Sequence, residues 1–243
     1  MYRDDVERCS HGGVTGAKAS PSVWATAMRE THSMEPVSSG SVRAAQKRLT
    51  RNRLLDSAVT VFAEKPFVDV TITDIAQAAG VTRVTVYAHF PGKGEIVQSL
   101  AERVYETMAE VYADLAAVPR WNRTEIRAWL DMAVEQWRTM SRTLWVVQMA
   151  GAAAASQVAG QSDRSRNRFV GEHDRFATML TEKPRQWRDV SPEEARQRAL
   201  MAVLQVEAFL TAWIAAELPL TTPDPLDLLT DALCHLLAPA LKE

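Results

Sequence analysis

The sequence predicts an all-α protein with an N-terminal helix-turn-helix domain and a larger C-terminal helical domain. Ala, Leu, Arg, Glu and Met dominate, and Val, Ile and Thr rarely alternate with polar residues as a half-buried strand requires. From Val42 onward, apolar residues recur at helical spacing. The chain has 243 residues, 47% hydrophobic and 24% charged, which is typical of a globular protein with one large or two modest domains.

Three segments follow from these patterns. Residues 1–42 are rich in Gly, Ser, Thr and charge without sustained periodicity, which predicts a flexible N-terminal tail. Residues 43–97 form the predicted helix-turn-helix domain, and 98–243 form the second domain. Met34 is an alternative start, in which case residues 1–33 do not belong to the native protein; mass spectrometry of that protein distinguishes the two starts.

The first predicted helix is amphipathic and ends at Pro66, because proline interrupts helical hydrogen bonding. Its buried side consists of Leu54, Leu55, Ala58, Val59, Val61 and Phe62. Thr71 begins the second helix as a cap, with Asp74 adding negative charge in the first turn. Gly80 supplies the tight turn that follows, because glycine tolerates a positive φ.

Thr82 caps a short third helix that runs to about His89, with Val86 and Phe90 facing the core. A long helix then runs from Lys93 towards Leu115. Further helices are predicted over residues 124–140, 142–157, 163–182, 192–217 and 224–241. The last two carry heptad-like apolar stripes, which are Ala199, Val203, Val206, Leu210 and Trp213, and Leu226, Leu229, Leu233, Leu236 and Ala240. Apolar residues also flank both stripes, so one face can pack internally and another against a second subunit.

The net charge of −2 hides an uneven distribution. Residues 43–93 hold eight basic and four acidic side chains, so this segment carries about +4 and the rest about −6. A basic patch on a neutral or acidic body is what a compact DNA-binding domain needs, although a solvated helix face produces the same count.

Other function classes find little support. No Ser/His/Asp, Cys/His, phosphate-loop or paired-carboxylate pattern appears, which disfavours an enzyme. Cys9 and Cys234 form neither a disulfide framework nor a metal site, and no cofactor is expected; a reducing cytoplasm is the simplest compartment. The most hydrophobic stretch, 144–155, is too short for a membrane span, and the N-terminus lacks the apolar centre of a signal peptide.

Residues 71–93 carry the most specific pattern. They contain Asp-Ile-Ala at 74–76, Ala-Gly-Val-Thr at 79–82 and Tyr-Ala-His-Phe at 87–90, followed by Lys93. This stretch resembles the helix-turn-helix of the tetracycline-repressor (TetR) family, and the close resemblance spans about residues 47–97. Val84 stands where many relatives carry Gly, and Gly94 departs from the usual Lys-Glu pair.

The motif predicts which side chains contact DNA. An arginine near the start of the third helix can donate two hydrogen bonds to guanine, and a threonine can meet a phosphate or a thymine methyl group. Longer polar side chains and the amides of a helix start can reach flanking phosphates. The predicted DNA-binding residues are Thr71, Thr82, Arg83, Thr85, Tyr87, His89 and Lys93. Capping or surface roles for the two N-cap threonines, Arg83, Tyr87 and His89 remain open.

The resemblance implies that the second domain binds an effector and that the last two helices form a dimer. Six of the seven tryptophans lie in this half with several methionines, a composition that suits an adaptable apolar cavity or an ordinary core. The candidate effector-binding residues are Trp137, Trp145, Met149, Phe169, His173, Phe176 and Phe209. His173 can bond a ligand oxygen or a neighbouring group, and Glu172-His173-Asp174 lacks the partners of a convincing metal site.

The chain is therefore predicted to be a cytoplasmic, nucleoid-associated transcriptional regulator that is neither an enzyme nor a membrane protein. It would bind a palindromic double-stranded DNA operator as a homodimer and, as a repressor, be released by a small apolar or aromatic effector of unknown identity. Two alternatives stay open, a DNA-binding protein of the same fold without a ligand and a transcriptional activator.

Overall fold

The computed structural model describes residues 39–157, 161–182, 186–219 and 224–238, and all regular structure in these ranges is helical. The expected all-α fold with an N-terminal helix-turn-helix and a C-terminal helical domain is thereby confirmed. Most of the predicted tail, including Cys9 and Met34, lies outside the described residues, as does Ala240.

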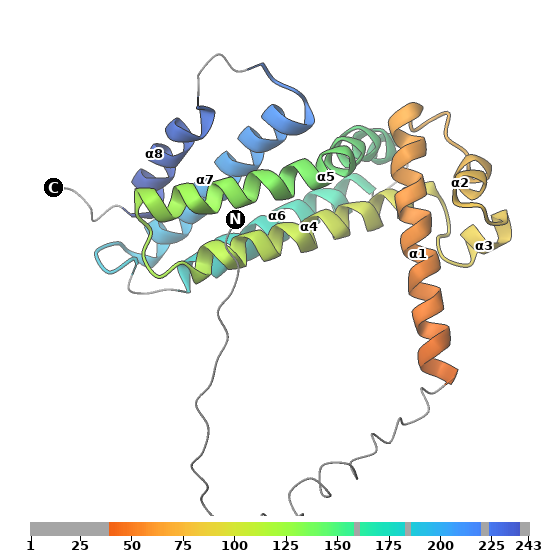
Figure 1. Ribbon diagram of the computed structural model, residues 1–243, viewed down its shortest axis with the longest axis horizontal. Coiled ribbons are helices and arrows are strands. Elements are labelled where there is room, and N and C mark those ends of the chain that lie inside the picture. The colour runs from red at the N-terminus through yellow and green to blue at the C-terminus, as the bar shows by residue number, and fades with distance from the viewer. Residues whose placement is uncertain (1–38, 158–160, 183–185, 220–223, 239–243) are drawn as a thin grey trace, which may run out of the picture. The chain divides into compact units, whose positions relative to one another are not determined.

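The helices of the described ranges are shown in Figure 1. Their bounds are α1 Ser39–Glu64, α2 Ile72–Ala79, α3 Arg83–Tyr87, α4 Lys93–Ala117, α5 Arg123–Gln157, α6 Gln161–Thr181, α7 Pro192–Leu210, the π-helical turn η1 Thr211–Ala215, and α8 Pro225–Leu237. α1 begins three residues before the predicted start at Val42 and ends two residues before Pro66, as proline requires.

Two apolar cores hold these helices. The first contains the predicted α1 residues, Ile75 and Val86 from the helix-turn-helix, and Ile96 and Leu100 from the first turns of α4. Val146 and Ala150 of α5 belong to the same core. The second core is formed by the rest of α4 and α5 with α6, α7 and α8. α4 therefore contributes to both cores.

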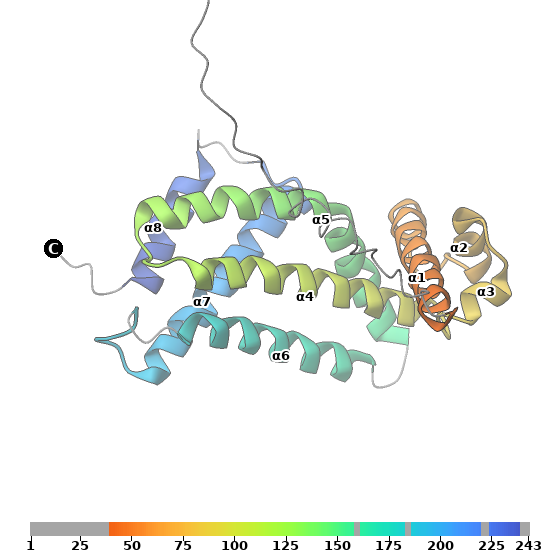
Figure 2. The ribbon, with the colours of Figure 1, turned by 60° about the horizontal axis from the view of Figure 1, so that its bottom comes forward.

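The two helices predicted over 124–140 and 142–157 are one continuous helix, α5. The prediction of a break at Ser141 was wrong because the serine hydroxyl donates to the Arg138 carbonyl at 2.9 Å and so remains compatible with a helix. Met140 and Leu144 on either side of Ser141 are both buried, so core packing supports the uninterrupted helix. Figures 1 and 2 both show α5 lying beside α4.

The helix predicted over 192–217 changes character at its end. After Leu210 it widens into η1, where the Ala216 amide donates to the Thr211 carbonyl at 3.1 Å, an i to i+5 bond. Glu217 then adopts a positive φ of 53°. Thr211 lies on the inner side of η1 and accepts a hydrogen bond from the indole Nε1 of Trp137 at 3.2 Å.

The stripe residues of α7 and α8 mainly pack inside the protomer. Ala199, Val203, Val206, Leu210, Leu226, Leu229 and Leu233 are all buried. Leu233 is fully buried, so Leu233→Arg would bury a charge in the core rather than specifically dissociate a dimer. The exposed apolar side chains of the two helices are instead Met201, Leu204 and Leu228.

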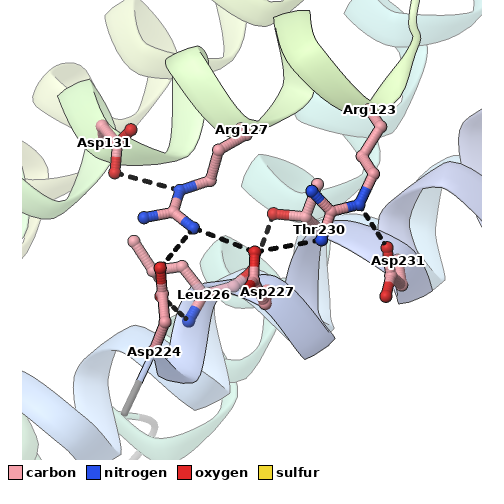
Figure 3. Close-up of polar contacts among 8 residues, drawn as sticks. All are labelled: Arg123, Arg127, Asp131, Asp224, Leu226, Asp227, Thr230 and Asp231. Atoms are coloured by element: carbon pink, nitrogen blue, oxygen red, sulfur yellow. Dashed lines mark hydrogen bonds and ion pairs between the residues drawn. The ribbon is translucent and has the colours of Figure 1, made fainter.

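Ion pairs link the start of α5 to α8 (Figure 3). Arg123 contacts Asp227 at 3.0 Å and Asp231 at 2.9 Å, and Arg127 contacts Asp224 at 2.6 Å. Asp224 also caps α8, since its carboxylate accepts from the Leu226 amide at 3.0 Å. The hydrogen bond from Arg127 lowers the pKa of Asp224 below its usual value.

Within the described residues, one helical stretch, Pro192–Ala215, is long and apolar enough to cross a membrane by length and composition. The sequence predicted no membrane span, because no uninterrupted apolar run in it is long enough. Ala199, Val203 and Val206 of this stretch pack in the second core, whereas Met201 and Leu204 are exposed.

Candidate nucleic-acid interface

A side-chain capping box begins α2 and a glycine ends it. The Thr71 hydroxyl accepts from the Asp74 amide at 3.2 Å, and the Asp74 carboxylate accepts from the Thr71 amide at 2.8 Å. These two bonds complete a capping box. The Thr71 hydroxyl also donates to the Asp74 carboxylate at 2.7 Å, and this bond, together with that from the Thr71 amide, lowers the pKa of Asp74 to about 2. Gly80 ends α2 at a φ of 62°, where a side chain is unfavourable.

The short helix α3 presents one side to the core and the other to solvent. Val86 is fully buried, whereas Arg83 is exposed and Tyr87 keeps 49% of its surface accessible. Val84 is 78% exposed beside them, an unusual position for a valine. Its exposure makes it a candidate for contact with a thymine methyl group, which the sequence reasoning overlooked because Val84 was noted only as a departure from the family pattern.

The threonines predicted to contact DNA already serve the local fold. Thr82 caps α3 by accepting from the Thr85 amide at 3.2 Å, and the hydroxyls of Thr82 and Thr85 are 3.0 Å apart. Thr71 and Thr82 are exposed, and Thr85 is half-buried. A phosphate oxygen accepts hydrogen bonds, so the hydroxyl proton decides whether a cap threonine can also contact it: the Thr71 proton is already donated to the Asp74 carboxylate at 2.7 Å, whereas Thr82 and Thr85 need only one of their two protons for the bond between them.

His89 lies beside positive charge at the end of the helix-turn-helix. Burial lowers the pKa of His89 below its usual value, and the charges of Lys47 and Arg51 lower it further. Arg51 stacks over Phe90 at 4.3 Å from the ring centroid and donates to Ser99 at 2.7 Å. A neutral His89 beside these cations can donate a hydrogen bond to a phosphate oxygen. The negative charge of the phosphate would in turn favour protonation of His89.

Lys93 is committed to contacts within the protein. Its Nζ donates to the carbonyl oxygens of Phe67, Val68 and Val70 at 2.6, 3.1 and 3.0 Å. An ammonium group has three donors, so these bonds account for all of them. The geometry favours a role in holding the loop before α2 over the predicted phosphate contact, which leaves the first amides of α4 as the available donors there.

The seven candidate effector residues are dispersed. Trp137 and Phe176 are fully buried core residues, and Phe209 packs partly buried against Trp213 at 6.0 Å between ring centroids. Trp145 and Met149 are exposed. Only Phe169 and His173 of the seven line the two adjoining cavities of the described residues that are formed by α4, α5 and α6.

These cavities share Ala101, Tyr105, Val147 and Phe169 in their walls. The outer one has a volume of about 680 Å³ and includes Arg166 and Arg168, which pair with Asp163 and Glu102 at 2.9 Å each. The inner one measures about 450 Å³ and reaches His173, Glu207 and the η1 residues Thr211 and Ala212. Glu207 was not among the predicted effector-binding residues. It is the single acidic residue in the apolar stretch 199–213, and this isolation in the sequence could have identified it.

Comparison with known proteins identifies relatives. Residues 54–100 match the family described as bacterial regulatory proteins, tetR family. The HTH-type transcriptional regulators TtgW and SrpR of Pseudomonas putida are each 39% identical over 89 residues, or 36% of this chain. These alignments span 66% of TtgW, itself described as uncharacterized, and 41% of SrpR. The chain thus matches less than two thirds of the length of either relative.

Solved structures extend the similarity to the C-terminal helices. FadR of Bacillus subtilis, in complex with stearoyl-CoA, aligns with 76% of this chain and 96% of its own at a TM-score of 0.55 and 18% identity. A SmeT–triclosan complex aligns with 79% of this chain and 91% of its own at a TM-score of 0.53 and 22% identity. At these identities the likeness is one of fold.

Proposed function

Because the chain belongs to the TetR family of transcriptional regulators, we propose that it binds a palindromic operator as a homodimer and acts as a repressor released by a small molecule. The observation that carries the proposal is the exposed side of α3, where Arg83, Val84 and Tyr87 project from a helix whose opposite side is buried. A recognition helix of this kind enters the major groove with its N-terminal residues against base edges.

We assign the side chains two kinds of contact. Arg83, Val84 and Thr85 lie at the start of α3 and are proposed to meet base edges. Tyr87, His89 and the cap threonine Thr82 are proposed to meet phosphates, and Thr71 stays a predicted DNA-binding residue only through its position before α2, since its hydroxyl donates to Asp74. Lys93 stays a predicted DNA-binding residue only through its position at the start of α4, since its ammonium group is bound to the loop.

The experiment separates the two kinds of contact. DNA fragments retained by the purified protein are sequenced to obtain an operator, and affinities for this operator and an unrelated duplex are measured by fluorescence anisotropy. Tyr87→Phe is expected to weaken binding to both duplexes by a similar factor. Arg83→Gln is expected to weaken binding to the operator about 5- to 150-fold and binding to the unrelated duplex less. Arg196→Gln, a matched change on α7, is the control. A change of sequence preference in Tyr87→Phe at unchanged affinity would refute its phosphate role.

The effector site is proposed to be the pair of cavities, and α4 the element that transmits binding. Ile96 and Leu100 near its start lie in the first core, whereas Tyr105 and Met108 farther along line the inner cavity. A ligand that prefers one position of α4 therefore shifts the helix-turn-helix towards the conformation that goes with that position and so changes its affinity for DNA. Bound DNA must in turn change the affinity for the ligand by the same factor. The bound molecules of the FadR and SmeT structures support a small-molecule effector.

The exposed apolar residues of α7 and α8 support dimerisation through these helices. In a dimer, two α3 helices separated by about one duplex turn would read the half-sites of the operator. Binding of this kind takes place on chromosomal DNA, so we propose a cytoplasmic, nucleoid-associated protein. An operator upstream of the transcription start would favour the activator alternative, and a DNA complex insensitive to all ligands would favour the alternative without an effector.

A further inference from the structure

A buried pair of ionisable side chains forms one wall of the inner cavity. His173 on α6 and Glu207 on α7 both line this cavity, and 4% and 12% of their side-chain surfaces are exposed. The His173 Nε2 lies 2.8 Å from the Glu207 Oε2. The opposite ring nitrogen, Nδ1, lies 2.6 Å from the Phe169 carbonyl oxygen.

These contacts define the protonation of the pair. A carbonyl oxygen only accepts hydrogen bonds, so Nδ1 carries a hydrogen. Burial lowers the pKa of His173, but the hydrogen bond to Glu207 and the charge of Glu207 outweigh it, and the net result lies above the usual value. A carboxylate also only accepts hydrogen bonds, so beside an ionised Glu207 the second ring nitrogen, Nε2, donates as well, and the geometry fits an imidazolium–carboxylate pair with no net charge.

The second oxygen of the Glu207 carboxylate, Oε1, is the other feature of this pair. Glu207 Oε1 is buried and has no hydrogen-bond partner among the described residues. The hydroxyl of Tyr112 donates to the Val203 carbonyl at 3.2 Å, and its pKa is raised by burial, by the Glu207 charge and by a hydrogen-bonding interaction with the Glu207 side chain. A buried acceptor without a partner is costly, and a ligand that supplies a donor recovers this cost.

We propose that the inner cavity binds a neutral, largely apolar molecule bearing a hydroxyl group, whose O–H donates to Glu207 Oε1. The inference rests on the proposed effector site and names the chemical class that this site selects. Apolar walls, among them Val104, Met108 and Leu144, surround the rest of the molecule. An anion would be repelled by Glu207, and a cation would be opposed by the His173 imidazolium, so the neutral donor fits best.

Four probes of similar size test the selection on the full-length protein: para-butylphenol, para-butylanisole, para-butylbenzylamine and para-butylbenzoate. Calorimetry at neutral pH is expected to show para-butylphenol binding about tenfold more tightly than the anisole, which lacks the donor. The cationic amine and the anionic benzoate should bind more weakly than the phenol. Equal affinities for the phenol and the anisole, or tighter binding of either ion, would overturn the proposal.

The substitution Glu207→Gln makes the test specific to this residue. In that variant the His173 Nε2 donates to the amide oxygen, which places the amide nitrogen, a donor, at the position of Oε1. The preference for the phenol over the anisole should disappear, and benzoate should bind more tightly than it does to the unsubstituted protein, because the Glu207 charge that repels it is gone. The matched control is Glu194→Gln, which lies on α7 like Glu207 but outside the cavity lining and pairs with Arg198.

Persistence of the phenol preference in Glu207→Gln would refute the role of Oε1. The four-probe comparison on the unsubstituted protein retains its force even if the variant fails to fold, which circular dichroism shows. Operator binding is measured separately, so absence of the phenol preference in the unsubstituted protein, with intact and effector-sensitive DNA binding, refutes only this inference. Loss of operator binding refutes the proposed function instead.

Discussion

Lys93 Nζ lies 4.5 Å from the centroid of the Phe67 ring and 2.6 Å from the Phe67 carbonyl oxygen. The same ammonium group bonds two more carbonyls of the loop before α2, at Val68 and Val70. A residue that the motif suggests for phosphate binding thus ties the start of α4 to the loop that precedes the helix-turn-helix.

Lys93→Met is therefore expected to lower the free energy of unfolding by about 1–3 kcal/mol, because carbonyls of the partly buried loop lose a charged donor. Urea denaturation followed by circular dichroism measures this change. Lys47→Met, on the exposed side of α1, is the control and should leave the unfolding midpoint unchanged. An unchanged midpoint for Lys93→Met together with a smaller salt dependence of DNA binding would restore the phosphate role.

Gly80→Ala should destabilise the protein by about 1 kcal/mol, since alanine at a φ of 62° is strained. The added Cβ would also approach Arg53 Nη2 to 2.8 Å, but this flexible side chain can move away. Gly171→Ala is the matched comparison. Gly171 lies within α6 with open space around its Cβ position, so alanine should raise stability by about 0.5–1 kcal/mol. Thermal melting of both variants tests the contrast, and shifts of the same sign would contradict it.

The capping box predicts an acid-dependent contribution from Asp74. Its folded-state pKa of about 2 lies below the unfolded value of 3.8, so the stabilisation is fully present above pH 4 and is lost as the pH falls towards 2. Melting temperatures of the unsubstituted protein and Asp74→Asn should therefore differ most above pH 4 and converge near pH 2. Asp69→Asn, outside the capping box, serves as the control. A difference that grows on acidification would reverse the sign and exclude this explanation.

Two leucines of α8 distinguish dimerisation from folding. Leu228 is 68% exposed, so Leu228→Arg should produce monomers in sedimentation velocity while the melting temperature of the monomer stays close to that of the unsubstituted chain. Leu233 is fully buried, and Leu233→Arg should destabilise the protomer by about 4 kcal/mol or more. Dimers that survive Leu228→Arg at micromolar concentration would place the subunit interface elsewhere.

The local features of the helix-turn-helix were predictable because each depends on residues a few positions apart. Thr71 and Asp74 form the expected cap, Gly80 adopts the expected left-handed conformation, and Thr82 begins α3. The same local reasoning failed at Ser141, because a serine that breaks a helix and one that bonds its own helix look alike in sequence. Core packing of Met140 and Leu144 decided the outcome.

The composition and helical spacing of the chain were sufficient to determine an all-α protein with a DNA-binding motif. Helical periodicity, caps and turns depend only on residues a few positions apart in the sequence. The cavities, the continuity of α5 and the internal position of the α7 and α8 stripes depend on how separate helices pack. His173 and Glu207 are 34 positions apart, and Lys93 and Phe67 are 26 apart. No periodicity relates such partners, and only burial of shared apolar surface brings their side chains within hydrogen-bonding distance.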